Sequence, residues 1–435
     1  MRPSPPCWTR TRRAHHTSEV AVQDHHVERL HALDAIRGYA LLLGIVFHAT
    51  MSFIPIYSGL LWPVHDLHRS DALSLTFYVL HTFRMMLFFI VAGFFGRLSL
   101  GAKGRRPWLI DRLKRIGLPL LISWPIAWGL CSGIYIWGAM VMRSENNFRR
   151  HLWSGLPEVP FLHLWFLYIL LLFYVLWLGT IALADRHPRA RDRCAAWLDR
   201  LVACSVRHPA GVLLLAAPMT LALWLTPRWR MWFGIVTPDR SLVPPLSSFF
   251  IYALAFGLGW FLHRQRGLLD TWRRRWLPNL AMAMLFTALS LWIVGLKARS
   301  IPVYDDTAKA WYAATYALAS WFWCYALMGL ALRYLDHNSA TRRYIADSSY
   351  WLYLVHLPIV MALQVAVASL DWPWWIKFGI IMTVGLGLMF ASYQYFIRYS
   401  FVGTFLNGKR QREPAHRIVY ESPPRAAAPQ GTPQQ

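Results

Sequence analysis

Long apolar segments recur along the whole chain, and this feature constrains its fold most. A typical soluble domain is about 45–50% apolar and about 25% charged, whereas this chain of 435 residues is 56% hydrophobic and 15% charged. Each apolar segment is close to the roughly 20 residues that a helix needs to cross a bilayer. The sequence therefore predicts an all-α polytopic membrane protein. We expect ten transmembrane helices, at 34–54, 73–96, 117–141, 161–184, 211–226, 244–262, 278–296, 309–332, 348–370 and 374–397.

The positive charge of the chain, +24 overall, is distributed unevenly along the loops. Of the 45 Lys and Arg, 32 lie in the two tails and in alternate loops, while 11 lie in the other loops or within four residues of them. Cytoplasmic loops carry an excess of Lys and Arg, so we expect both termini in the cytoplasm. The basicity follows from topology and from attraction to the head groups of the lipid bilayer. It does not indicate a nucleic-acid partner.

The domain organisation is simple, because no loop is long enough to form a separate soluble domain. We expect one membrane domain at 31–402, between a disordered basic tail at 1–30 and a disordered Pro-, Ala- and Gln-rich tail at 403–435. The first tail contains no apolar core of a signal peptide. The loop 185–210 is expected to hold a short interfacial helix, and the proline-containing segment 211–226 to be kinked or partly re-entrant.

The cysteines do not suggest a metal or redox function. The five cysteines form no C-x-x-C or metal-ligand spacing. No metal site and no permanently bound cofactor are predicted. The stretch GLCSG at 129–133 fits a G-x-x-x-G helix contact, which leaves a homo-oligomer open.

The first span carries three polar residues, Asp34, Arg37 and His48. Arg37 and His48 are 11 residues apart, or about three helical turns and roughly 16 Å, so they share one face of the helix. Asp34 lies one turn before Arg37 on the same side. A charge at membrane depth costs at least ~2.5 kcal/mol. We therefore predict Asp34, Arg37 and His48 as catalytic residues.

Further polar residues lie within other spans. His81 and Arg84 are one turn apart in the second span, and Arg84 is too far from either end to reach water. We expect His48 and His81 at similar depth, facing one cavity. His163 begins the fourth span, and His356 lies about eight residues into the ninth.

Several of these residues also have an ordinary structural explanation. Arg37 can reach the lipid head groups with Asp34 as its partner. His48 can be a core histidine that hydrogen-bonds a carbonyl, and His163 can be interfacial. Arg84, near the middle of the membrane, is the hardest to explain in this way.

A basic turn, DRLKRIGLPLL, precedes the third span and contains Arg112, Lys114 and Arg115. It can be ordinary positive-inside charge or a phosphate site, because clustered guanidinium groups bind phosphates in a bidentate manner. Coenzyme A thioesters combine an anionic nucleotide with a long thin arm. With the nucleotide at this turn, the arm would carry an acyl group into the bundle. His48 would then take the proton from an acceptor hydroxyl.

The motifs of the chain resemble those of the membrane acyltransferase 3 family. They are R-x10-H in LDAIRGYALLLGIVFH, followed in the family's usual order by FRMMLFFIVAGFF, RLKRIGLPLL, HLWFLYILLLFY and SYWLYLVHLPIV. The resemblance covers nearly everything between about 30 and 400. Within the family, the chain looks most similar to the branch thought to add succinyl groups to periplasmic glucans.

The resemblance implies acyl transfer at the bacterial inner membrane, from a cytoplasmic acyl-CoA to an extracytoplasmic carbohydrate. The co-substrate would be succinyl-CoA or acetyl-CoA. His48 and Arg37 match the essential residues of R-x10-H, and Arg112 and Arg115 match an RxxR motif near the donor. The residues expected to bind donor or substrate are Arg84, His81, Arg112, Arg115, His163 and His356. Direct transfer with His48 as general base, and relay through an acylated His48, both remain open.

Two other classes of function compete with this interpretation. A transporter or exporter of an anionic or sugar substrate would line its path with the same buried residues. It would leave its substrate chemically unchanged, and no inverted repeat is evident in the sequence. A non-enzymatic scaffold would leave Arg84 and His48 buried without a reason, so it ranks last.

Overall fold

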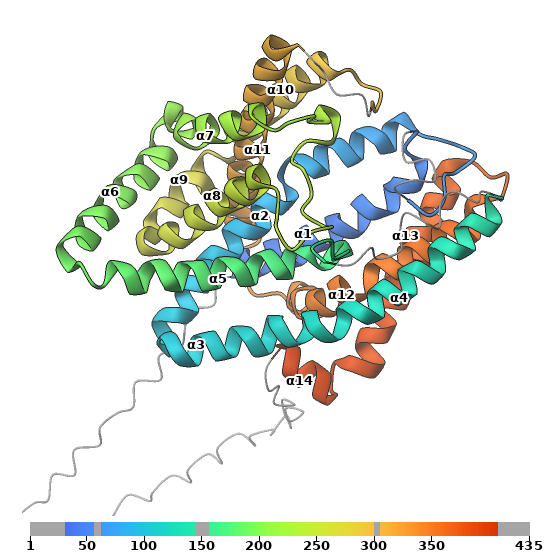
Figure 1. Cartoon of the computed structure of the whole chain (residues 1–435), viewed down its shortest axis with the longest axis horizontal. Coiled ribbons are helices and arrows are strands. Elements are labelled where there is room, and N and C mark those ends of the chain that lie inside the picture. Colours follow the sequence, from blue (N-terminus) through green and yellow to red (C-terminus); the bar gives the residue numbers. More distant parts are fainter. Residues whose placement is uncertain (1–30, 56–61, 144–155, 300–304, 408–435) are drawn as a thin grey trace, which may run out of the picture. The chain divides into compact units, whose positions relative to one another are not determined.

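The regular secondary structure in the part of the chain that the computed structural model describes is helical (Figure 1). Within that part, nine helical spans are long and apolar enough to cross a membrane, and a bent helix pair raises the number to ten. The only β-type pairing there is an isolated bridge between Glu158 and Ser241. The predicted all-α polytopic membrane fold is confirmed. The structure describes residues 31–55, 62–143, 156–299 and 305–407.

The long helices follow the predicted spans in order. They are α1 (His31–Thr50), α2 (Asp71–Lys103), α4 (Leu118–Val141), α5 (Trp165–Ala184), α6 (Pro188–Arg207), α7 (Leu213–Trp224), α8 (Leu246–Leu262), α10 (Trp276–Val294), α11 (Asp306–Tyr334), α12 (Ala340–Ala368) and α13 (Trp374–Ser392). The shorter elements are η1 (Met51–Phe53), α3 (Arg105–Arg112), η2 (Leu113–Gly117), η4 (Leu162–Leu164), η5 (Pro209–Val212), η6 (Met231–Phe233), η7 (His263–Leu268), α9 (Leu269–Arg274), η8 (Tyr393–Ile397) and α14 (Phe401–Asn407). The predicted tail 1–30, and the tail 403–435 beyond Asn407, lie outside the described residues.

The region between α5 and α8 contains the one broken helix pair. α6 and the run Pro209–Trp224 are bent by 119° at their junction (Figure 1). Pro209 has no N–H to continue a helix, and it favours an extended residue before it. His208 is accordingly extended, with φ −83° and ψ 137°. The expected helix in 185–210 is present as α6. The bend lies at His208, before the segment 211–226 where a kink was expected, and α7 continues through Pro218.

The first helix lies at the centre of the packing. α1 contacts α2, α11, α12 and α13. Outer helices instead carry exposed apolar side chains, such as Leu121 on α4 and Trp292 on α10. Such surfaces suit lipid contact. Most of α1 is thereby surrounded by protein, while the Arg37 side chain near its start is 44% exposed.

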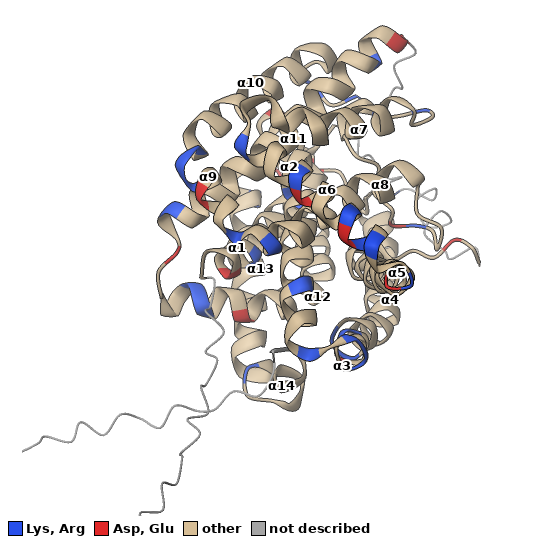
Figure 2. Ribbon diagram, turned by 90° about the vertical axis from the view of Figure 1, so that its left-hand side faces the viewer, with Lys and Arg blue, Asp and Glu red and all other residues tan. Residues whose placement is uncertain are grey.

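Basic residues gather at the end of the bundle where α1 begins, and Figure 2 looks onto that end. We call it the basic end, and it comprises α3, η2, α6, α9 and the first turn of α12. Arg105 and Arg191 both bind Asp185, and Arg264 binds Asp199. Hydrogen bonds from Arg191 and Arg105 hold the pKa of Asp185 below its usual value. The link between α3 and α6 is therefore retained at mildly acidic pH.

Two glycines allow α2 and α8 to touch backbone to backbone. A Cβ at Gly93 would lie 2.0 Å from the carbonyl oxygen of Phe256 on α8. A Cβ at Gly259 would lie 1.9 Å from the carbonyl oxygen of Ile90 on α2. Small residues at such contacts let membrane helices approach closely. This contact fixes α2, which carries His81 and Arg84.

We predict that Gly93→Ala lowers the free energy of unfolding by ~1–3 kcal/mol, because the added methyl group forces the two helices apart. Thermal unfolding of the purified protein in detergent measures the effect. Gly129→Ala on α4 is the matched control, because a Cβ at Gly129 meets no atom within 4 Å. Equal melting temperatures for the two variants would contradict the contact.

Candidate active site

The N-terminal half of α1 presents Asp34 and Arg37 at the basic end. Arg37 Nη2 lies 3.7 Å from Asp34 Oδ1 and donates to the carbonyl of Ala346 on α12 at 3.4 Å. The Arg37 side chain is 44% exposed. The predicted pairing of Asp34 and Arg37 is present, and along the same helix Arg37 lies about three turns and Asp34 about four turns from His48.

Arg84 lies buried beside the middle of α1, with 6% of its surface exposed. Its guanidinium carbon lies 3.8 Å from the centre of the Phe47 ring, and Nη1 donates to the carbonyl of Gly44 at 3.4 Å. Within the described residues it forms no ion pair, and its Nε has no hydrogen-bond partner. A buried guanidinium in this state is available to an anionic or carbonyl ligand.

Three histidines from distant parts of the chain meet near the C-terminal end of α1. The ring centres of His48 and His356 are 5.1 Å apart, and those of His356 and His163 are 4.8 Å apart. They come from α1, α12 and η4. We call His48, His163 and His356 the histidine cluster. The sequence indicated each residue separately but did not place them together.

A proline on α12 explains how His163 is held. Pro358 lies inside the helix and has no N–H to donate to the carbonyl of Leu354, four residues earlier. His163 Nε2 lies 3.1 Å from that oxygen and takes the place of the missing donor. The motif VHLP thus creates the acceptor that draws His163 to α12.

The hydrogen bonds indicate which ring nitrogens are protonated. His163 Nε2 faces the carbonyl of Leu354, and His356 Nδ1 lies 2.7 Å from the carbonyl of Tyr353. A carbonyl only accepts, so each of these nitrogens carries the proton. His163 Nδ1 is then an acceptor, and it has no partner among the described residues, as is also true of His48 Nδ1. The cluster therefore has free ring nitrogens for proton transfer.

His81 shares a neighbour with the histidine cluster. Its ring centre lies 5.5 Å from that of Phe47, and the Phe47 ring lies 5.1 Å from that of His48. His81 also stacks on Phe77 at 5.7 Å. His48 and His81 therefore lie in one region of the interior, separated from direct contact by an aromatic ring.

Arg112 and Arg115 lie at the basic end, within a continuous helix rather than a turn. Arg112 Nη2 donates to Ser99 Oγ, and its guanidinium lies 5.6 Å from the rings of Trp108 and Tyr174. Arg115 lies in the π-helical turn η2 and pairs with Asp111 at 3.0 Å. Single π turns are common at functional sites. The two arginines therefore bind different partners, Arg112 to Ser99 and Arg115 to Asp111.

The predicted site residues thus occupy two places. Asp34, Arg37, Arg112 and Arg115 lie at the basic end, and His48, His81, Arg84, His163 and His356 lie in the interior. In the described part of the chain, no group of three or more His, Cys, Asp and Glu has the geometry to hold a metal ion. The arrangement provides cations at one end of α1 and proton-transfer groups at the other.

Comparison with known proteins agrees with this arrangement. The profile of a family described as an acyltransferase domain matches residues 30–394. The chain belongs to the acyltransferase 3 family. Every predicted site residue lies within the matched part of this acyltransferase. Its helices make it a multi-pass membrane protein.

Relatives of this acyltransferase include proteins named glucans biosynthesis protein C. Those of Escherichia coli strain SMS-3-5 and strain K12, and that of Shigella boydii serotype 4, are each 23% identical to the chain. The alignments cover 395 residues, which is 88% of this chain and 95% of each relative. No solved structure matches the chain.

Sequence reasoning missed several polar residues around the cluster, including Trp62, Asp66, Gln364 and Lys377. Gln364 lies within the predicted span 348–370, and Lys377 lies within the last predicted span, 374–397. A polar residue inside an apolar span could therefore have indicated both of them.

We predict that His163→Leu costs ~1–3 kcal/mol of stability in the native Pro358 background, because the buried Leu354 carbonyl loses its donor. In a Pro358→Ala background the helix supplies an N–H to that carbonyl, so the same change should cost less. Thermal unfolding of the four proteins of this cycle gives the comparison. An identical cost in both backgrounds would exclude the proline explanation.

Proposed function

We propose that the protein is an O-acyltransferase that moves a succinyl or acetyl group from acyl-CoA to a hydroxyl of an extracytoplasmic carbohydrate. The acyltransferase 3 membership supports acyl transfer. The printed name of the relatives, glucans biosynthesis protein C, supports a glucan as the carbohydrate. We place the protein in the bacterial inner membrane.

The observation that carries the proposal is the distribution of functional groups along α1. Arg37 lies at the basic end, Arg84 approaches the helix at Gly44, and His48 in the last turn contacts His356 of the histidine cluster. The distance from Arg37 to His48 is roughly 16 Å. One helix thus joins a cationic end to a buried proton-transfer centre, as transfer between two sides of a membrane requires.

The basic end faces the cytoplasm in this proposal, because Lys and Arg are retained on that side. Acyl-CoA approaches from there, and its phosphates are bound near Arg112 and Arg115. Its extended arm then delivers the thioester towards His48. Acyl-CoA acts as a co-substrate and not as a resident cofactor.

The chemistry can proceed by two routes. In direct transfer, His48 takes the proton of the acceptor hydroxyl, and the oxygen attacks the thioester carbonyl. The C–S bond breaks, and the CoA thiolate recovers the proton from His48. In the relay, a ring nitrogen of His48 attacks the thioester carbonyl, the C–S bond breaks, and the CoA thiolate takes the proton of the imidazole. The acceptor oxygen then attacks the acyl group, the C–N bond breaks, and the hydroxyl proton returns to His48.

Arg84 has two roles open to it near His48. Its guanidinium can stabilise the oxyanion that develops on the thioester carbonyl, an interaction that a water-poor interior strengthens. Alternatively, it can bind the free carboxylate of a succinyl group. The absence of an ion-pair partner for Arg84 among the described residues leaves its charge free for either role.

We predict that His48→Ala binds succinyl-CoA or acetyl-CoA as wild type does but loses thioester turnover by at least ~100-fold, the contribution typical of a general base. Binding is measured by titration in nanodiscs, and turnover by release of free CoA. Failure of the well-folded wild type to bind any CoA species would overturn the donor assignment and favour a transporter.

A second experiment distinguishes the two routes. If a labelled acyl group is trapped on the protein in the absence of acceptor, the relay is supported. If no labelled protein forms under single-turnover conditions, direct transfer is supported.

We predict that Arg84→Gln reduces the preference for succinyl-CoA over acetyl-CoA by ~10–100-fold, as expected for losing one charge-assisted hydrogen bond. The ratio of kcat/KM for the two donors is the measurement. Arg97→Gln is the matched control, since Arg97 lies on the same helix and contacts the ring of Trp260. An unchanged ratio with lowered kcat would assign Arg84 to the oxyanion instead.

A further inference from the structure

The connection between α1 and α2 is tied down where α1 ends, away from the basic end. We call its residues 62–70 the strap. The backbone N–H of Asp66 donates to the carbonyl of Ser52 at 2.8 Å, and that of Ser70 donates to the carbonyl of Phe53 at 3.0 Å. Both acceptors follow directly after α1. The strap is therefore hydrogen-bonded to η1, which follows the last turn of α1 that carries His48.

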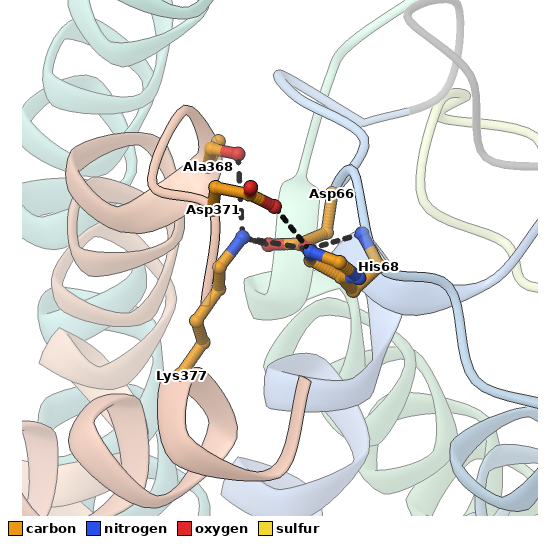
Figure 3. A network of polar contacts seen from close by, with 5 residues as sticks. All are labelled: Asp66, His68, Ala368, Asp371 and Lys377. Atoms are coloured by element: carbon orange, nitrogen blue, oxygen red, sulfur yellow. Dashed lines mark hydrogen bonds and ion pairs between the residues drawn. The ribbon is translucent and has the colours of Figure 1, made fainter. Parts of the chain in front are cut away.

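A buried ion pair fastens the strap to α13, as Figure 3 shows. Lys377 Nζ lies 2.9 Å from both carboxylate oxygens of Asp66, and the two side chains are 0% and 2% exposed. His68 Nε2 lies 2.8 Å from Asp371 Oδ1 in the turn between α12 and α13. Removing one member of a buried pair leaves the other charged and unpaired. The pair thus fixes the position of the strap.

Gln364 connects the strap to the last turn of α1. Trp62 Nε1 donates to Gln364 Oε1 at 2.8 Å, while Gln364 Nε2 donates to the carbonyls of His48 at 3.1 Å and Ala49 at 3.0 Å. Carbonyls in the last turn of a helix lack intrahelical donors, so this amide caps the turn. One side chain from α12 therefore holds both the backbone of His48 and the indole of Trp62.

The indole of Trp62 also lies against the imidazole of His48. The two ring centres are 6.1 Å apart and the planes are within 8° of parallel. Trp62 is 5% exposed. Trp62 therefore lies beside His48 near the end of α1 that is remote from the basic end, while His48 itself is half-buried.

We propose that Trp62 and Gln364 are positioning residues for His48, and that Trp62 shields the imidazole from water so that the acyl group goes to the acceptor. Asp66 and Lys377 keep Trp62 in place. The inference rests on the proposed role of His48. Without the shield, a water molecule would give its proton to His48 and its oxygen would attack the thioester carbonyl. The products would be the free acid and CoA.

The test is the hydrolysis of succinyl-CoA without acceptor, by purified protein in nanodiscs. Trp62→Ala should raise the rate of hydrolysis at least ~5-fold, since water exclusion is what protects a reactive intermediate. The rise should vanish in Trp62→Ala/His48→Ala, because hydrolysis proceeds through the exposed imidazole. Trp375→Ala is the matched control, as Trp375 is 61% exposed in the first turn of α13. It should hydrolyse succinyl-CoA at the wild-type rate.

Less disruptive substitutions at the same contacts test the proposal if Trp62→Ala fails to fold. Trp62→Phe retains a ring but not the hydrogen bond to Gln364, and Gln364→Leu removes the cap on α1. Both should raise hydrolysis less than Trp62→Ala and lower kcat while leaving KM unchanged. Asp66→Asn/Lys377→Met removes both charges together and should also raise hydrolysis.

The outcomes separate this inference from the proposed function. If all well-folded strap and Gln364 variants hydrolyse succinyl-CoA at the wild-type rate while His48→Ala loses turnover, the shielding role alone is overturned. A rise in Trp62→Ala that persists when His48 is also replaced would likewise overturn it. Full turnover in His48→Ala would instead overturn the proposed function.

Discussion

Polar side chains at bilayer depth are costly unless other parts of the protein surround them, and α1 concentrates such residues in one helix. Asp34, Arg37 and His48 lie along α1, so the helix has to be enclosed by others. α2, α11, α12 and α13 surround it. The buried Arg84 shows how this is achieved, because its guanidinium rests on Phe47 and on the carbonyl of Gly44. The site is central because its polar helix could not be stable at the lipid surface.

α12 provides the second half of the site along the whole length of α1. Its carbonyl at Ala346 accepts from Arg37, and Tyr350 Oη donates to the carbonyl of Arg115 at 2.7 Å. Further along, His356 meets His48, and Gln364 caps the last turn of α1. Contacts from this one helix thus reach the basic end, the histidine cluster and the strap. A change in the position of α12 would therefore move groups that take part in every step of the proposed transfer.

The sequence predicted those features that depend on local periodicity and composition. Apolar length determined the helices, and the 11-residue spacing placed Arg37 and His48 on one face of α1. The burial of Arg84 followed from its distance to either end of its span. The meeting of His163 and His356 with His48 depends on tertiary packing across several loops, which no local pattern encodes. Pro358 was readable in the sequence, but its effect on Leu354 became clear only once His163 was seen opposite it.

The strap escaped prediction for a related reason. Asp66 reads as an ordinary loop carboxylate and Lys377 as an interfacial lysine, because each side chain alone is costly to bury. Only their pairing makes burial acceptable. Pairs of this kind join positions 311 residues apart. They are therefore invisible to an interpretation that proceeds along the chain.

The central claim is that the acyl group enters at the basic end and leaves past His48 on the other side of the membrane. The most direct measurement uses proteoliposomes of one orientation, with labelled succinyl-CoA on one side and a soluble glucose oligosaccharide on the other. The account predicts labelled oligosaccharide only when succinyl-CoA faces the basic end and the oligosaccharide faces the strap. Equal labelling with both substrates on the basic side would contradict transfer across the membrane.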